Sequence, residues 1–411
     1  MIMNSVQDIH CQHFVQRKNR FCRMTVKPHE SYCGEHKPTT FSATNVVEND
    51  VNASTDRIQC PLDNTHTCYK SRLSQHLKKC NAGKEPSLPY IKKDYNRVEV
   101  KNVMKRSLMQ YSHSDIVEVI KKVNQVYNKH ISGSITSVDT THDILKDEIE
   151  CPQYGKTTLK HLLQTSSLIG ILDLYNLLQP ETCYVEFGAG KGKLSFWLAK
   201  SISNLSNSSV LLIEKASLRH KLDNKLEKGK DLVYRIRADI ADVVLENIDM
   251  VTKRKQVVGV TKHLCGEATD LAIKCLIAAK KEKPVLGALL SFCCHHQCQW
   301  ESYVGKNFFK NVGLSHGDFE IMCGLVSWAV CGTGKSRGNQ SKENLNSSEG
   351  ALNISLSEMK NIGFKCKHII DWGRKCYLDE LSFYSVLHYY VNPNVTLENV
   401  CIVAINEELK K

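Results

Sequence analysis

The sequence predicts an α/β protein with a doubly wound, mostly parallel sheet, preceded by two small modules rich in cysteine and histidine. From about residue 154, short apolar runs alternate with helical patterns, as in sheets that helices cover on both faces. A glycine-rich turn stands between one of these runs and a helix. The first eighty residues contain few apolar side chains, so they need a metal or disulfides to fold.

Composition limits the classes of protein that fit. The chain has 411 residues, 18 cysteines and a formal net charge of +12. It begins without an apolar leader and has no run near the roughly 18 apolar residues that span a membrane. We therefore expect a protein of the cytoplasm or nucleus, with no membrane contact, whose cysteines are reduced thiols or metal ligands. The positive charge favours an anionic partner such as nucleic acid, although many basic proteins bind none.

The first module spans 8–37. Its C-x10-C-x10-C-x2-H spacing offers three thiolates and an imidazole, which suit a tetrahedral Zn²⁺ ion. The alternative imidazoles are those of His13 and His29. The expected ligands are Cys11, Cys22, Cys33 and His36.

The second module spans 57–83 and has the spacing C-x5-H-x9-H-x3-C. Its last two ligands are four residues apart, so on a helix they face one side. Cys68 is the alternative ligand, and we expect it to be a free thiol. The expected zinc ligands are Cys60, His66, His76 and Cys80.

Residues 84–153 are predicted to be a linker followed by a helical segment. A helix is expected from Ser114, since apolar residues recur there at 3.6-residue spacing. Basic residues precede it and fit either a phosphate backbone or an ordinary solvated surface equally well. They are Lys92, Lys93, Arg97, Lys101, Lys105 and Arg106.

The main domain is predicted over 154–408, with a polar, disordered insertion at 332–350. It opens with a helix over 159–178. The expected strands cover 183–187, 210–214, 234–239, 257–262 and 286–292, and further apolar runs cover 383–391 and 400–405.

The turn after the first strand reads EFGAGKGK. Its glycines allow a tight turn and a close approach of backbone N–H groups to a ligand. The third glycine of a dinucleotide fingerprint is missing. An acidic residue two positions before the first glycine instead suits the cationic end of S-adenosylmethionine. The expected cofactor contacts here are Glu186, Gly188, Gly190 and Gly192.

Two further acids are expected to bind this cofactor. Glu214 ends the next strand, where an acid typically binds ribose hydroxyls. Asp239 ends the third strand. The turn resembles the first motif of the class I methyltransferases, and this resemblance implies that Asp239 contacts the adenine amino group.

The candidate catalytic residues follow the fourth and fifth strands, at the edge of the sheet that faces the ligand. Transfer of a methyl group from S-adenosylmethionine is an in-line displacement, so the enzyme must position the acceptor atom and remove its proton. The candidate bases are Lys262, His263, His295 and His296. A third zinc site at CCHHQC is disfavoured, because adjacent residues of an extended chain point opposite ways.

Several motifs together resemble one family. The run CPLDNTHTCYKSRLSQHLKKC resembles the CHHC zinc fingers, an RNA-associated class. EFGAGKGKLS, KHLCG-x-A-T-D, CCHH-x-C and the ending with Gly373-Arg374, Tyr390, Glu398-Asn399 and Ala404 resemble the eukaryotic tRNA 2′-O-methyltransferases that modify nucleotide 4 of the acceptor stem. The resemblance implies a class I methyltransferase fold, S-adenosylmethionine and Zn²⁺ as cofactors, and tRNA as partner, with no protein partner evident. The polar insertion departs from the family pattern.

Other functions stay open at this point. One is an NAD-type oxidoreductase, which the missing glycine disfavours. Another is a non-catalytic RNA-binding adaptor, which the intact turn and its acids disfavour. The last is a methyltransferase that acts on another RNA, on protein or on a small molecule.

Overall fold

The computed structural model describes residues 10–15, 20–22, 26, 30–33, 57–80, 88–97, 106–216, 232–331 and 354–409. The chain divides into two units, Met1–Leu88 and Pro89–Lys411. The insertion expected at 332–350 lies outside the described residues.

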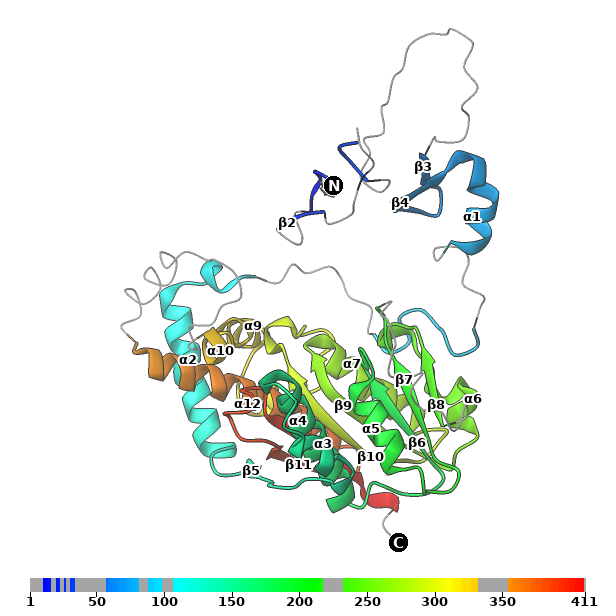
Figure 1. The fold of residues 1–411 in the computed structure, drawn as a ribbon. Coiled ribbons are helices and arrows are strands. Elements are labelled where there is room, and N and C mark those ends of the chain that lie inside the picture. Colours follow the sequence, from blue (N-terminus) through cyan, green and yellow to red (C-terminus); the bar gives the residue numbers. More distant parts are fainter. Residues whose placement is uncertain are drawn as a thin grey trace. The chain divides into compact units, whose positions relative to one another are not determined.

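The first unit contains two small hairpins. In the first, an edge-to-face contact between Phe14 and Phe21, with ring centroids 5.3 Å apart, joins the two short strands. In the second, an antiparallel pair leads into a single helix (Figure 1). The elements are β1 (Phe14–Val15), β2 (Arg20–Phe21), β3 (Arg57–Cys60), β4 (Asp63–Tyr69), η2 (Lys70–Arg72) and α1 (Leu73–Lys79).

The second unit is built on an eight-stranded sheet in the order β5-β11-β12-β10-β9-β6-β7-β8. Neighbours from β10 to β8 run parallel, whereas β12 is antiparallel to both β10 and β11. This confirms the predicted doubly wound, mostly parallel sheet. The strands are β5 (Thr136–Ser137), β6 (Thr182–Phe187), β7 (Ser209–Ile213), β8 (Val233–Ile236), β9 (Gln256–Cys265), β10 (Val285–Cys293), β11 (Phe383–Tyr389) and β12 (Val400–Asn406).

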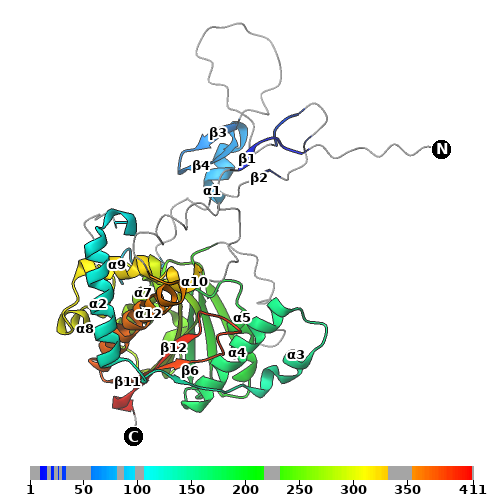
Figure 2. The same ribbon diagram turned by 90° about the vertical axis from the view of Figure 1, so that its left-hand side faces the viewer.

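Helices cover both faces of this sheet. Figure 2 shows α4 (Lys156–Leu174) and α5 (Lys193–Ser201) on one side of the strands, and α7 (Glu267–Ala279) and α12 (Leu356–Asp379) on the other. The remaining α-helices are α2 (His113–His130), α3 (Lys146–Glu150), α6 (Asp249–Thr252), α8 (Lys306–Asn311), α9 (His316–Leu325) and α10 (Trp328–Cys331). None of the helices in the described residues is long and apolar enough to cross a membrane.

The central strands are apolar throughout because both of their faces are buried. In β6, Val185 and Phe187 enter the core beneath α7, whereas Tyr184 enters the core beneath α4 and α5. The carboxyl ends of the parallel strands therefore meet at one edge of a rigid sheet, and the loops that follow them lie side by side.

Helix α2 begins at His113, one residue before the predicted start, because Ser112 is its N-cap. The Ser112 hydroxyl accepts from Asp115 N, and Asp115 Oδ2 accepts in return from Ser112 N and Oγ. The buried residues Ile116, Val119 and Val123 pack into a separate core with α9 and α12. The predicted apolar stripe is thus the packed face of this helix.

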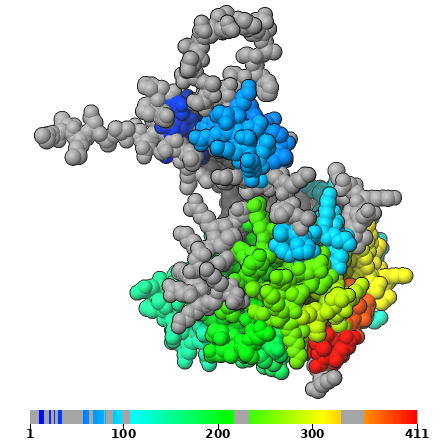
Figure 3. All heavy atoms as spheres, turned by 90° about the vertical axis from the view of Figure 1, so that its right-hand side faces the viewer, coloured from blue at the N-terminus to red at the C-terminus, as the bar shows by residue number. Residues whose placement is uncertain are grey.

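Part of the region predicted as a linker packs against the sheet domain. Ile91 forms a bridge with Val243, and Asn96 Nδ2 donates to the carbonyls of Ile240 and Val243 at 2.7 Å each. In Figure 3 the light-blue segment 89–97 lies against the green segment. Two of the basic residues form ion pairs within the unit, Arg97 with Asp94 and Glu267, and Arg106 with Glu320. Those two guanidinium groups are therefore already engaged.

Candidate active site and zinc modules

The glycine-rich turn joins β6 to α5. Its three glycines have φ angles of +65° at Gly188, +54° at Gly190 and +73° at Gly192, a region that disfavours other residues. A Cβ on Gly188 would lie 2.7 Å from Leu264 Cδ1. Around Gly190, by contrast, no atom of the described residues comes within 4 Å of such a Cβ. The turn is closely packed underneath and open at Gly190, as a backbone cradle for a ligand requires.

Glu186 lies buried beneath this turn. Its Oε2 accepts from Ser195 N at 3.0 Å and from the Ser195 hydroxyl. The N-cap of α5 is Gly192, which has no side chain, so the Glu186 carboxylate caps the helix instead. Burial raises the pKa of Glu186 to about 7, although the hydrogen bonds from Ser195 act in the opposite direction. The predicted contact with the cofactor stays a prediction.

Glu214 and Asp239 follow the strands β7 and β8, and Glu214 contacts the turn. Glu214 directly follows β7, and its two oxygens accept from Gly190 N at 2.8 Å and Ala216 N at 2.7 Å. The prediction that Asp239 ends a strand is wrong, because β8 stops at Ile236. Asp239 instead caps the 3-10 helix η6 (Ile240–Asp242).

The carboxylate of Asp239 has two partners. It accepts from Ala241 N at 3.0 Å and pairs with Lys215 Nζ at 2.6 Å. Burial alone would raise the pKa of Asp239, but the hydrogen bonds from these two groups lower it below its ordinary value. Asp239 is therefore an anion at neutral pH, beside the turn.

Lys262 was predicted to end its strand but lies three residues before the end, because β9 continues to Cys265. Its Nζ donates to His161 O and to Thr165 Oγ1, each at 2.8 Å, and both partners belong to α4. The side chain is only 8% exposed. Burial lowers the pKa of Lys262 to about 7, and the charge of Lys193 adds to this effect. A substantial fraction of Lys262 is therefore neutral at physiological pH.

The three histidine candidates differ from one another. His263 is half-buried, and burial together with the Lys262 charge lowers its pKa to about 4. His295 is buried, with Nε2 at 2.9 Å from both oxygens of Asp371. His296 is exposed on η8 (His295–Gln297). Of these three, His295 is the one already committed to a buried ion pair.

That ion pair belongs to a buried network centred on Arg374. Its guanidinium donates to Asp270 Oδ2 at 2.7 Å, to Asp371 Oδ1 at 2.9 Å and to Cys298 Sγ at 3.2 Å. Asp371 has a pKa below its ordinary value because His295 and Arg374 outweigh the effect of burial. The network links α7, α12 and the loop after β10. Sequence reasoning missed it, although Asp270 and Arg374 both stand in the quoted motifs.

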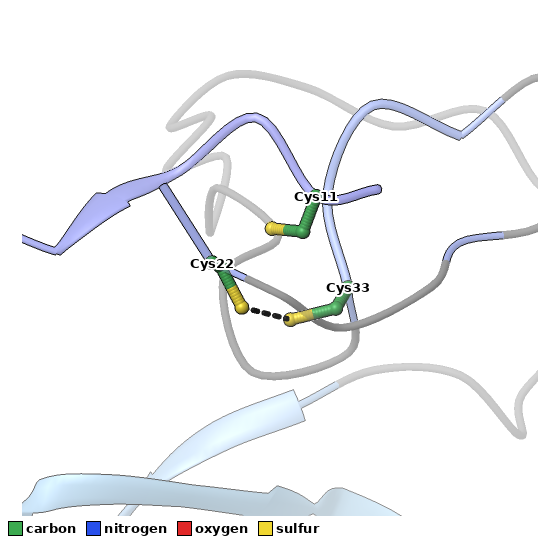
Figure 4. A group of neighbouring side chains, drawn as sticks. All are labelled: Cys11, Cys22 and Cys33. Atoms are coloured by element: carbon green, nitrogen blue, oxygen red, sulfur yellow. Dashed lines mark hydrogen bonds between the residues drawn. The ribbon is translucent and has the colours of Figure 1, made fainter. Parts of the chain in front are cut away.

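The first zinc module brings three predicted ligands together. The sulfur atoms of Cys11, Cys22 and Cys33 all lie within 4.8 Å of one another. Figure 4 shows Cys22 and Cys33 turned toward each other, with their sulfurs 4.0 Å apart and Cys11 beside them. The fourth predicted ligand, His36, lies outside the described residues. The three thiols fit a zinc ion.

The second module also gathers three predicted ligands. Cys60 Sγ lies 3.6 Å from Cys80 Sγ and 3.1 Å from His76 Nε2. His66 lies on β4, and its side chain is outside the described part of the structure. Cys68 is buried in the hairpin, opposite Ile58, and is not a member of this group. The donor set of sulfur and imidazole fits zinc.

Comparisons with known proteins agree with this architecture. The sequence matches the family described as Methyltransferase TRM13 over residues 163–405, the CCCH zinc finger in TRM13 protein over 9–37 and the U11-48K-like CHHC zinc finger over 57–81. These families and the sheet order support the predicted cofactors, S-adenosylmethionine and Zn²⁺.

Two relatives are similar over almost their whole length. The chain is 33% identical to a human protein named tRNA:m(4)X modification enzyme TRM13 homolog, covering 96% of this chain and 94% of the relative. It is 32% identical to the mouse protein of the same name, covering 97% and 94%. The likeness to solved structures is low. The DszA carbon methyltransferase gives a TM-score of 0.31 at 12% identity, covering 84% of this chain and 72% of that one. The resemblance inferred from the motifs is confirmed, and the chain belongs to the TRM13 methyltransferase family.

Proposed function

We propose that the protein transfers a methyl group from S-adenosylmethionine to the ribose 2′-OH of nucleotide 4 in the acceptor stem of certain tRNAs. The names of the human and mouse relatives support tRNA as the substrate. The observation that carries the proposal is Lys262, a buried amine with a pKa of about 7 at the catalytic edge. A ribose hydroxyl is a weak nucleophile, so a neutral amine there is the base that this reaction needs.

The chain offers a site for the methyl donor around the glycine-rich turn. The turn is open at Gly190, whose N–H donates to the Glu214 carboxylate, and Asp239 offers a second carboxylate after the next strand. When bound, S-adenosylmethionine supplies a methyl group already activated by its sulfonium. In this proposal Glu214 binds the ribose hydroxyls and Asp239 binds the adenine amino group.

Lys262 then acts on the acceptor. Its Nζ is oriented by two hydrogen bonds to α4. In the neutral form it accepts the proton of the 2′-OH as the oxygen–carbon bond forms and the carbon–sulfur bond breaks. Lys193 disfavours the protonated form of Lys262 and so keeps the base available.

A cavity of about 240 Å³ supports RNA as the acceptor. It lies between α4 and α5 and is lined by His161 and Thr165, the two partners of Lys262. Lys193 and Lys200 give it positive charge, and Trp197 gives it an aromatic face. Unstacked nucleotides are recognised by this combination of aromatic stacking and cationic contacts to phosphate.

The test is transfer of labelled methyl from S-adenosylmethionine to unmodified tRNA, followed by nuclease mapping. We expect the label in an alkali-stable dinucleotide of the acceptor stem, because a 2′-O-methyl group blocks cleavage of the next phosphodiester. An Asp239→Ala variant is the control and should lose the label. Cofactor binding without label on any tRNA would refute the tRNA assignment, and label on a base would refute the 2′-OH.

A further inference from the structure

Three cysteines meet at the carboxyl ends of β9 and β10. Cys265 and Cys293 are the last residues of their strands and are paired in the parallel ladder. Their sulfur atoms are 3.1 Å apart. Cys294 follows directly, and the three sulfurs all lie within 4.8 Å of one another.

Cys294 reaches this cluster through an unusual backbone conformation. Its φ of +51° and ψ of +41° are left-handed, which is uncommon for a residue other than glycine. The chain therefore turns back at Cys294, so the adjacent cysteines do not point opposite ways. The chain is therefore not extended at CCHHQC, and the ground for disfavouring a metal site there is removed.

The loops around the cluster are held tightly. A Cβ on Gly266, the residue after Cys265, would lie 2.6 Å from the backbone of Gln297. The hydrogen bond between His295 and Asp371 fixes the loop after β10 on its buried side. The three sulfurs are thus preorganised by packing, which is what a metal site requires of its ligands.

We propose that Cys265, Cys293 and Cys294 bind a thiophilic metal ion, Zn²⁺ in the first instance, as a third metal site at the catalytic edge. A disulfide uses two sulfur atoms, whereas here a third sulfur lies within 4.8 Å of both. The sulfurs are as close as those of the zinc modules, where they are 4.0 and 3.6 Å apart. Cys265 is exposed, so a fourth coordination position faces outward and takes water or a polar group of the substrate.

The experiment measures zinc per chain in the full-length protein by mass spectrometry of the metal, after dialysis against zinc buffered with a chelator. We expect three zinc ions in the unmodified chain and two in the Cys265→Ser and Cys293→Ser variants. Cys151→Ser is the matched control: this cysteine is also partly exposed but lies outside the cluster, so three ions should remain.

A second readout does not depend on retained zinc. Replacement by Co²⁺ gives thiolate-to-metal absorption, which should fall in the Cys265→Ser variant and stay unchanged in Cys151→Ser. Circular dichroism checks that each variant is folded. Two zinc ions in all of these proteins would overturn the proposal, as would a mass 2 Da lower that shows a disulfide between Cys265 and Cys293. Neither result depends on the methyl acceptor.

Discussion

Whereas the buried side chains of Lys367 and Arg374 pair with carboxylates, no carboxylate of the described residues is bonded to the buried amine of Lys262. Its hydrogen bonds go to a carbonyl and a hydroxyl, which can accept from either the charged or the neutral amine. Nothing in this pair of bonds compensates for the cost of burying charge, which is why the pKa falls to about 7. At the scale of a single residue, this makes Lys262 a base at physiological pH.

The pH dependence of methylation follows from this assignment. A base works when it is neutral, so kcat should rise with pH, reach half its maximum near pH 7 and then level off. Lys193→Met removes a neighbouring positive charge, which should raise the pKa of Lys262 and shift the rise to higher pH. A pH profile at saturating tRNA measures this, and an unshifted profile would contradict the role given to Lys193.

Lys262→Arg separates proton removal from charge stabilisation. The guanidinium stays protonated, so a base at this position is lost while positive charge is kept. We expect kcat to fall by about 10²–10⁴-fold, the usual range for a general base. Single-turnover methyl transfer tests this, with binding of S-adenosylhomocysteine as the folding control. An active Arg variant would assign Lys262 to stabilising the alkoxide.

Arg374 has a structural role that a stability measurement can isolate. Arg374→Met leaves the buried Asp270 without its guanidinium partner, whereas Asp371 keeps only His295, and breaking such a buried pair costs about 3–5 kcal/mol. Lys375→Met is the matched control on the same helix, since its pair with Asp379 is partly exposed and contributes less than about 1 kcal/mol. Urea unfolding of both variants gives the two free energies. Similar losses of unfolding free energy in the two variants would contradict the stabilising role of the Arg374 network.

At the scale of elements, the β6–α5 connection combines a capped helix with an open turn. Glu186 caps the first turn of α5 on its buried side, and the glycines leave the opposite side of the turn open. The helix start is therefore fixed whether or not a ligand is bound. Binding at the turn then costs little ordering entropy, because the cradle is already formed.

Gly190→Ala tests the cradle. Gly190 and Gly313 share a left-handed φ and open surroundings among the described residues, so either change to Ala should cost roughly 1–2 kcal/mol of backbone strain. Only the Gly190 variant places a methyl group where the cofactor would lie. Its affinity for S-adenosylhomocysteine should fall at least about tenfold, or about 1.4 kcal/mol, by calorimetry. An equal loss in Gly313→Ala would mean that strain and not contact is responsible.

The sequence predicts the elements better than their ends. Doubly buried strands such as β6 and β7 are evident as apolar runs flanked by turn residues, and the glycine-rich turn places the cofactor side. Strand ends depend on pairing partners: β9 extends to Cys265 because β10 continues beside it, and β8 stops early. The left-handed Cys294 is invisible in the sequence, since only tertiary packing holds a non-glycine residue there.

At the scale of the whole molecule, we expect the two units to have separate tasks. The zinc modules have little apolar core and depend on metal, whereas the second unit has two large cores on either side of its sheet. Loss of one zinc ion should therefore unfold a module and leave the cofactor site intact. We expect the modules to contribute to tRNA affinity.

His76→Ala tests this division. The variant should lose one zinc ion and bind tRNA more weakly, because structural zinc supplies most of the folding free energy of such a module. Its affinity for S-adenosylhomocysteine should not change. Cys68→Ser is the control from the same hairpin and should keep its zinc. Zinc loss in Cys68→Ser would identify Cys68 as a ligand.

The position of β12 has a consequence for biosynthesis. It is the last of the eight strands in the sequence, yet it lies between β10 and β11 and pairs with both. When synthesis has reached α12, the edge of β10 that pairs with β12 is therefore still unpaired. This edge is long and apolar, and such edges template pairing with other chains. A frameshift or premature stop before residue 400 would leave this edge permanently open, so its product should aggregate and not persist as a shortened enzyme.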